Sequence, residues 1–273
     1  MEQDVIKVSY KLIALDLDGT LLNEKNEYTS TSRNIIKKLT KTGIKVVIAT
    51  GRMLVSALPF VNNLELEGPV ITYNGAYIKD VKQDQVLYHK PIDYEVALQI
   101  IKDCQQLDLH LNLYQNDRLY VEENNDFSRG YEISNGVEAE EVGPLHNFIE
   151  KPPTKLLIIE EERERHQYYL KYFQEKYGEQ LEIAESESHY IQFMNQGVSK
   201  GQALSYLSDY FSIPRTEIMA VGDSSNDLSM LSWAGLGVAM GNASEQAKQE
   251  SDKIAPSRGE DGVTQVIKEF FDI

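Results

Sequence analysis

The stretch LIALDLDGTLL, Leu12–Leu22, places two aspartates in an apolar run that is typical of a buried β-strand. Asp16 and Asp18 are one leucine apart and precede Gly19 and Thr20. Alternation along a strand would direct both carboxylates to the same face. A turn at Asp18 and Gly19 would explain the second acid, but an unpaired carboxylate at Asp16 is costly without a cation beside it. We therefore interpret the pair as part of a functional site.

Three further apolar runs alternate with helical patterns. They are KVVIAT, which ends at Thr50, PVITYNG, which reaches Asn74, and EIMAVGD, which ends at Asp223. Alternating strands and helices predict a mostly parallel sheet with right-handed crossovers and helices on both faces. Functional residues gather at the carboxyl ends of such strands, which is where the unusual polar residues fall. The predicted class is α/β, with a Rossmann-like, doubly wound parallel-sheet core.

The middle of the chain has a different pattern. HLNLYQNDRLYVEE and LEIAESESHYIQFMN each resemble a hairpin, and KLLIIEEERERHQYYLKYFQEKYG resembles a strand followed by a charged helix. We expect an inserted α+β domain at residues 85–189 that lies over the strand ends of the parallel sheet. The domain that contains this sheet is then discontinuous and consists of residues 1–84 and 190–273.

Composition restricts the function classes. With a net charge of -16 over 273 residues, the chain is not expected to bind nucleic acid or a membrane surface. A phosphate would need local donors or a metal to overcome this charge. The single cysteine, Cys104, excludes an internal disulfide and is expected to be a half-buried structural thiol. The start, MEQDVIKVSY, has no secretory pattern, and we expect a cytoplasmic protein.

Two segments give weaker indications of a functional site, one at residues 50–52 and one at Lys200. The hydroxyl of Thr50 and the backbone N–H of Gly51 would form a small anion-binding corner, although an ordinary strand-to-helix turn explains them too. Arg52 is as well suited to a substrate contact as to a surface ion pair. Lys200 follows the predicted cap Ser199 in the first turn of a helix, where a cation opposes the helix dipole unless an anion lies nearby.

The segment GDSSND is the second strong cluster. Asp223 ends a strand, and Asn226 and Asp227 follow in the next turn. Capping explains one of these acids but not the whole set. Asp16, Asp18 and Asp223 at neighbouring strand ends would repel one another unless a hard cation neutralised them. Mg²⁺ is the natural candidate, since it prefers oxygen ligands, and the five histidines are scattered rather than clustered for zinc.

With DLDGT, the strand end at Thr50, Lys200 and GDSSND in this order, the sequence resembles the haloacid dehalogenase (HAD) superfamily of phosphatases. More narrowly, it resembles the Cof-type sugar-phosphatase branch, which has a large C2-type (C2B) cap. The resemblance implies that the inserted α+β domain at residues 85–189 is this cap and determines substrate specificity, and that residues 1–84 and 190–273 form the catalytic core. The resemblance spans nearly the whole chain and includes the position of the insert and the segment YNGA at Tyr73–Ala76. Ser225 fills a position that varies in the family.

The resemblance implies a role for each motif residue. Asp16 is the nucleophile that forms an aspartyl-phosphate, and Asp18 is the general acid and then the general base. Thr50 and Lys200 hold the transferring phosphoryl group, aided by backbone N–H groups near Asp18, Gly19 and Gly51. The remaining positions implied in substrate or phosphate binding are Arg52, Asn74 and Asn226.

The resemblance also implies a metal and a substrate class. Mg²⁺ is bound by the side chains of Asp16 and Asp223 and by the backbone carbonyl of Asp18, while Asn226 and Asp227 orient these ligands. The implied function is Mg²⁺-dependent hydrolysis of small phosphomonoesters, such as sugar phosphates or similar metabolites. The expected partner is therefore a small phosphorylated metabolite, and the chain is expected to be a monomer or a weak homo-oligomer.

Two alternatives keep the same fold. A phosphosugar mutase would return the phosphoryl group to a sugar and would need a bisphosphate activator. A catalytically silent regulator would bind a phosphometabolite without turnover, but it has no need for a nucleophile and an acid together. A structural module explains none of the clusters. In the predicted cap, Tyr114, Arg118 and His189 are polar or aromatic residues for which we expect surface or packing roles.

Overall fold

The computed structural model describes residues 9–186, 189–271 and 273. The described chain divides into two compact units. Unit 1 contains the residues up to Gly51, residues 59–87 and the residues from Ser199 onward, and unit 2 contains residues 52–58 and 88–198. The first eight residues, part of the segment without a secretory pattern, lie outside the described residues, as do residues 187 and 188 of the second predicted hairpin.

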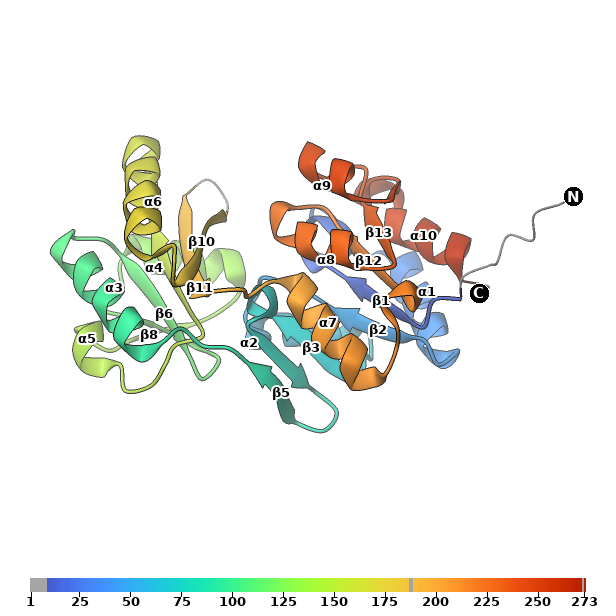
Figure 1. Ribbon diagram of the computed structural model, residues 1–273, viewed down its shortest axis with the longest axis horizontal. Coiled ribbons are helices and arrows are strands. Elements are labelled where there is room, and N and C mark those ends of the chain that lie inside the picture. Colours follow the sequence, from blue (N-terminus) through green and yellow to red (C-terminus); the bar gives the residue numbers. More distant parts are fainter. Residues whose placement is uncertain (1–8, 187–188, 272) are drawn as a thin grey trace, which may run out of the picture. The chain divides into compact units, whose positions relative to one another are not determined.

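Unit 1 is built on a five-stranded parallel sheet (Figure 1). Its central strand is β1, Leu12–Leu15, which pairs with β12 on one side and with β2 on the other. All four side chains of β1 are buried, as expected for a strand that is covered on both faces. The strand order is β14 (Lys253–Ile254), β13 (Leu236–Ala239), β12 (Ile218–Gly222), β1 and β2 (Lys45–Ile48).

The helices of unit 1 form two layers. The chain passes from β1 through α1 to β2, and from β12 through α8 to β13, in opposite directions along the sheet. Right-handed crossovers therefore place α1 and α8 on opposite faces. In keeping with this, α1 packs beside α10, and α8 packs beside α7 and α9. The helices are α1 (Ser30–Lys41), the part of α2 (Leu54–Asn63) from Pro59 onward, α7 (Lys200–Phe211), α8 (Leu228–Trp233), α9 (Glu245–Glu250) and α10 (Gly262–Phe270).

The predicted strand PVITYNG becomes β3, which joins the parallel sheet through one bridge only. Ala49, just after β2, pairs in parallel with Ile71. Otherwise β3 belongs to a separate sheet with β4 and β5, and it pairs with β4 in antiparallel fashion. The chain reverses after β3 because Tyr73, Asn74 and Gly75 all adopt positive φ. The strands are β3 (Pro69–Thr72), β4 (Tyr77–Asp80) and β5 (Gln85–His89).

Unit 2 contains a six-stranded sheet in the order β10-β11-β9-β6-β7-β8. Both predicted hairpins are present, as β6 with β7 and as β10 with β11. One face of the sheet packs on α3 and α6 around a buried aromatic pair, Phe173 and Phe193, whose rings meet edge to face. The elements are α3 (Tyr94–Gln106), β6 (Leu111–Gln115), β7 (Arg118–Val121), α4 (Asp126–Asn135), β8 (Ala139–Glu141), α5 (Leu145–Phe148), β9 (Lys155–Ile159), α6 (Arg163–Tyr177), β10 (Leu181–Ser186) and β11 (Tyr190–Asn195).

The two units differ from the predicted domain boundaries in three places, at residues 52–58, 85–87 and 190–198. The boundary at residue 190 assigns β11 to the core, whereas β11 pairs with β9 and β10 in the sheet of unit 2. Residues 52–58 also belong to unit 2, because the Asp117 carboxylate accepts hydrogen bonds from the backbone N–H groups of Leu54 and Val55 at 2.9 and 2.8 Å. The assignment of catalysis and specificity to separate domains stays a prediction.

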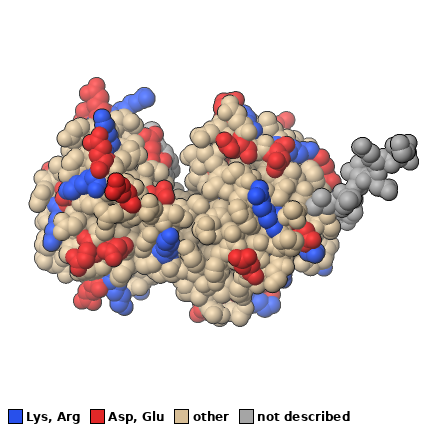
Figure 2. Space-filling view, in the orientation of Figure 1, with Lys and Arg blue, Asp and Glu red and all other residues tan. Residues whose placement is uncertain are grey.

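The structure shows how charge is distributed on the surface and how deeply Cys104 is buried. On the face drawn in Figure 2, acidic and basic side chains are interspersed over both units. Within the described ranges, no helix is long and apolar enough to cross a membrane. Cys104 is fully buried in α3 rather than half-buried, and burial raises the pKa of its thiol.

Candidate active site

Asp16 lies directly after the central strand of unit 1. Its backbone N–H donates to the carbonyl of Val221 in β12 at 3.1 Å, and its side chain is buried. β1 ends at Leu15, and the chain then enters an irregular turn at Leu17–Leu21, in which Asp18 and Gly19 have non-helical backbone angles. Asp18 therefore lies in a turn and is exposed, so the expected strand alternation of the two acids is wrong. The strand ends at Leu15, before either aspartate, so neither acid belongs to it.

Lys200 is the buried cation that the carboxylate of Asp16 requires. It is the first residue of α7, it is fully buried, and Ser199 caps the helix by accepting from the Gln202 N–H. The Lys200 ammonium donates to Oδ1 of Asp16 and to Oδ1 of Asp227, each at 2.6 Å. These two carboxylates offset the unfavourable position of a cation at a helix N-terminus.

Asp227 is fully buried and uses both of its oxygens. Oδ1 accepts from Lys200, and Oδ2 accepts from the backbone N–H groups of Asp223 and Ser224 at 2.9 and 3.0 Å. Asp227 thus joins the Lys200 ammonium to the end of β12. This arrangement makes it suited to orient the site rather than to offer an oxygen to a ligand.

Asp223 faces the turn that follows Asp16. Its Oδ1 accepts from the Thr20 hydroxyl at 3.0 Å, and its Oδ2 accepts from the Ser224 hydroxyl at 3.2 Å. The backbone of Gly19 comes so close that a Cβ there would lie 2.2 Å from Oδ2 of Asp223. Gly19 also has a φ of +83°, so this position favours glycine for two reasons.

Asp16, Asp223 and Asp227 each offer an oxygen within 4.8 Å of the others, which suits a hard cation. Among the described residues, the Asp16 side chain accepts one hydrogen bond only, from Lys200 to Oδ1, so lone pairs remain on both of its oxygens. Asp227 accepts from the Lys200 ammonium and from two backbone N–H groups, whereas each oxygen of Asp223 accepts from one hydroxyl only. The donor set therefore favours Asp16 and Asp223 as side-chain ligands.

Electrostatics also favour a bound cation here. Burial, followed by the charge of Asp227, raises the pKa of Asp16 well above its usual range, against the opposing effect of Lys200. Burial and Asp227 likewise raise the pKa of Asp223. Burial by itself lowers the pKa of Lys200, but Asp16 and Asp227 outweigh it and raise that pKa. One ammonium thus faces three carboxylates, and a further cation would stabilise their ionised forms.

The second strand end contributes a compact polar corner. Thr50 is buried, its N–H donates to the Ile71 carbonyl at 2.9 Å, and its own carbonyl accepts from the Asn74 N–H at 3.1 Å. The Asn226 side chain donates to Oδ1 of Asn74 at 3.0 Å. A Cβ on Gly51 would lie 2.8 Å from this same Asn74 oxygen, so Gly51 must be small.

Four residues considered in the sequence analysis lie outside this polar corner: Arg52, Tyr114, Arg118 and His189. Arg52 belongs to unit 2, where its guanidinium lies 3.5 Å from the Ser56 hydroxyl. Tyr114 is buried and packs edge to face on Tyr131, as expected for a packing role. Arg118 is exposed and lies 3.7 Å from Glu140, and His189 packs on Tyr190 with ring centroids 4.0 Å apart.

Sequence reasoning missed four residues that shape the site. Thr20 and Ser224 hold the carboxylate of Asp223. A Cβ on Gly75 would lie 2.3 Å from the Ser199 carbonyl oxygen, and one on Gly201 would lie 2.3 Å from the Ser229 carbonyl oxygen. These glycines therefore allow the start of α7, and with it Lys200, to approach its neighbours. Gly75 directly follows Asn74, and Gly201 directly follows Lys200, so the sequence could have indicated both glycines.

Comparison with known proteins identifies the family. A model of the haloacid dehalogenase-like hydrolases matches residues 13–267. The chain belongs to the haloacid dehalogenase-like hydrolases. This result confirms the predicted family with its Cof-type branch, the α/β fold class and the enzyme class, a phosphoric monoester hydrolase.

Individual relatives of this hydrolase cover nearly its whole length. The 5-amino-6-(5-phospho-D-ribitylamino)uracil phosphatase YitU of Bacillus subtilis is 31% identical over 266 residues, which cover 96% of this chain and 98% of that protein. The pyridoxal phosphate phosphatase YbhA of Escherichia coli is 29% identical and covers 94% of this chain and 97% of its own length. The crystal structure of a haloacid dehalogenase-like hydrolase from Bacteroides thetaiotaomicron is 31% identical, with a TM-score of 0.90 over 96% of this chain and 100% of that one.

We predict that Gly19→Ala lowers the affinity of the site for the metal that activates phosphate release. The new Cβ displaces the carboxylate of Asp223, so the apparent affinity for the activating metal falls by about 10- to 100-fold. Gly43→Ala is the matched control, because Gly43 also has a positive φ but has no atom within 4 Å of a Cβ. Metal titrations of phosphate release measure both variants. Equal effects of the two substitutions would contradict a specific role for Gly19.

Proposed function

We propose that this hydrolase is a Mg²⁺-dependent phosphatase that transfers the phosphoryl group of a small phosphomonoester to Asp16 and then to water. The observation that carries the proposal is the state of the Asp16 carboxylate. Lys200 holds Oδ1 at 2.6 Å, while Oδ2 receives no hydrogen bond from any described residue. One oxygen is thus fixed in place, and the other is available to attack phosphorus.

In the first proposed step, Asp16 attacks phosphorus, the ester P–O bond breaks, and an aspartyl-phosphate forms. Asp18 donates a proton to the leaving oxygen. In the second step, Asp18 takes a proton from water, which attacks the phosphorus. The P–O bond to Asp16 breaks, which releases inorganic phosphate and restores the Asp16 carboxylate. The exposed position of Asp18, two residues after the buried Asp16, supports an exchange of protons with the leaving group and with water.

The proposed metal ligands are the side chains of Asp16 and Asp223 and the backbone carbonyl of Asp18. Bound there, Mg²⁺ would neutralise charge that develops on the phosphoryl oxygens. Asp227 holds Asp223 through its backbone N–H, and Thr20 and Ser224 hold the Asp223 carboxylate. These contacts support a preorganised ligand set.

The proposed phosphoryl cradle consists of donors from two strand ends and from the start of α7. Lys200 supplies the positive charge, and Thr50 supplies a hydroxyl at the end of β2. The backbone N–H groups of Gly19 and Gly51 lie where the chain must remain free of a side chain. Preorganised donors of this kind stabilise the charge of the transition state. The hydrogen bond between Asn226 and Asn74 supports the shape of this cradle.

We further propose that the substrates are small phosphorylated metabolites. The relatives named above act on a phosphorylated ribitylamino-uracil and on pyridoxal phosphate, which both combine a ring with a phosphomonoester. Sugar phosphates, as the sequence suggests, belong to the same size class. We assign the choice among them to the inserted residues 85–189, acting as a cap that excludes water and contacts the leaving group.

The first test replaces the two acids in turn. We predict that Asp16→Asn abolishes turnover, because an amide is a poor nucleophile, and that Asp18→Asn lowers the rate by about 10² to 10⁴. Asp84→Asn, at an exposed acid of the β4–β5 turn, is the control and leaves the rate unchanged. Phosphate release from a panel of phosphomonoesters measures all three. Substantial activity in Asp16→Asn would refute the nucleophile, and a requirement for a bisphosphate activator would favour a mutase.

The second test removes the metal. We predict that a chelator stops phosphate release and that added Mg²⁺ restores it, because three clustered carboxylates are not neutralised by Lys200 alone. Calorimetric titration of Mg²⁺ into the metal-free protein should show a binding event that Asp223→Asn weakens. Full activity in the presence of chelator would contradict the metal site.

A further inference from the structure

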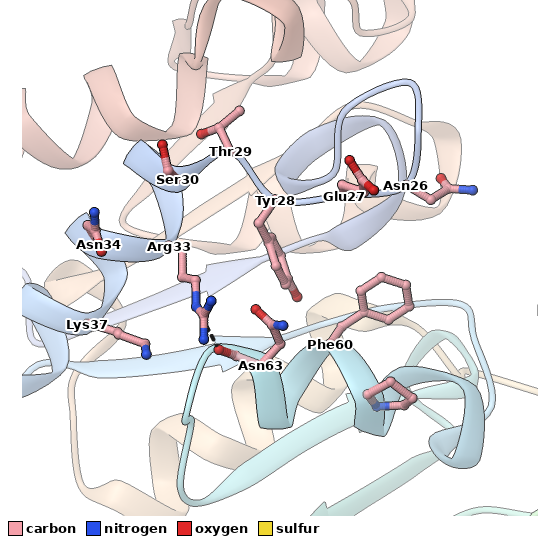
Figure 3. Close-up of a pocket in the computed structure, with 11 residues that line it drawn as sticks. Asn26, Glu27, Tyr28, Thr29, Ser30, Arg33, Asn34, Lys37, Phe60 and Asn63 are labelled. Atoms are coloured by element: carbon pink, nitrogen blue, oxygen red, sulfur yellow. Dashed lines mark hydrogen bonds between the residues drawn. The ribbon is translucent and has the colours of Figure 1, made fainter.

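A pocket lies in unit 1, and its lining does not include Asp16, Asp223 or Asp227. It encloses about 740 Å³, a size suited to a small organic ligand, and it lies between α1 and the second half of α2 (Figure 3). None of its lining residues belongs to the candidate active site. They are Asn26, Glu27, Tyr28, Thr29, Ser30, Arg33, Asn34, Lys37, Pro59, Phe60 and Asn63.

One part of the lining is cationic in a strongly acidic protein. Arg33 and Lys37 are one helical turn apart on α1, and both line the pocket. Lys37 is paired with Glu65 at 2.5 Å, whereas no carboxylate of the described residues lies within ion-pair distance of Arg33. The pKa of Glu65 is lowered by its hydrogen bond with Lys37 and by the charge of Lys37. The charges of Arg33 and Lys41 lower it further. Arg33 therefore keeps a positive charge on the lining that is not paired with any described carboxylate.

The Arg33 guanidinium is also oriented. Its Nε donates to the Asn63 carbonyl at the end of α2 at 3.1 Å, as the dashed line in Figure 3 marks. Within the described chain, the terminal nitrogens of Arg33 have no hydrogen-bond acceptor. A planar guanidinium fixed through Nε presents the remaining donors as a fork, which matches the two oxygens of a carboxylate, phosphate or sulfonate.

The opposite part of the lining is aromatic. The rings of Tyr28 and Phe60 meet edge to face with centroids 6.1 Å apart, and both line the pocket. In Figure 3, Tyr28 projects from the segment before α1 toward Phe60 on α2. Aromatic walls favour a flat apolar ring. The one acid of the lining, Glu27, is exposed, so solvent screens its repulsion of an anion.

We propose that this pocket is a second binding site, separate from catalysis, for a small oxyanion that carries a flat ring. The oxyanion pairs with Arg33, and the ring packs against Tyr28 and Phe60. The hydroxyl and amide groups of Ser30 and Asn34 supply further polar contacts at the rim. The site does not depend on the proposed phosphatase mechanism, because the two share no residue.

The test uses 2-naphthalenesulfonate, which has a ring and a permanent oxyanion but no phosphoester to hydrolyse. Isothermal titration calorimetry of the whole chain at low salt should show binding, with much weaker binding of sulfate alone and of the uncharged 2-naphthalenemethanol. Arg33→Gln should weaken the binding of the sulfonate by at least about tenfold, since it removes charge-assisted hydrogen bonds. Arg33→Lys should give an intermediate affinity, because it keeps the charge but loses the fork.

Lys38→Gln is the matched control. Lys38 lies on the same helix, is exposed and does not line the pocket, so its loss of charge should change the affinity by less than about twofold. The rate of phosphate release should equal that of the parent chain in Arg33→Gln, Arg33→Lys and Lys38→Gln, which reports an intact fold. The proposal is overturned if the sulfonate does not bind, if Arg33→Gln and Lys38→Gln weaken binding equally, or if binding is lost only in Asp16→Asn.

Discussion

The buried ammonium of Lys200 is the interaction on which the candidate active site depends. It contacts Asp16 at the end of β1 and Asp227 after β12, so one cation ties two neighbouring strand ends to the start of α7. Its burial is tolerable only because both carboxylates are present, and each carboxylate is buried only because the ammonium is. Removing one member leaves an uncompensated charge in the interior. Chemistry and local stability are therefore coupled at this point.

Close backbone approach makes this arrangement sterically feasible. Gly75 allows the turn after β3 to lie against the Ser199 carbonyl oxygen at the start of α7, and Gly201 allows α7 to lie against the Ser229 carbonyl oxygen, which brings Lys200 to the sheet edge. Gly19 does the same for the turn beside Asp223. In each case the neighbour is a backbone carbonyl or a site carboxylate, so a methyl group would displace a part of the site itself. The small residues thus determine the positions of the charged ones.

The sequence predicts the parts of the fold that follow from local patterns. The buried run of β1, the alternation with helices and the acids at the strand ends led to the α/β class and to the family. Contacts between distant residues were not predictable in the same way. The hydrogen bond from Thr20 to Asp223 spans 203 positions, and the antiparallel pairing of β3 with β4 depends on positive φ at Tyr73 and Asn74. Likewise, β11 joins unit 2 through pairing with β9, which periodicity does not reveal.

The central claim is that Asp16 becomes phosphorylated during turnover. The most direct measurement is rapid acid quenching within the first turnover, followed by borohydride reduction and mass spectrometry of the peptide that contains Asp16. Borohydride reduces an acyl phosphate at an aspartate to homoserine, so the account predicts homoserine at position 16 only when substrate is present. Phosphate release in the first turnover with an unmodified Asp16 peptide, or with the modification at another acid, would contradict the account.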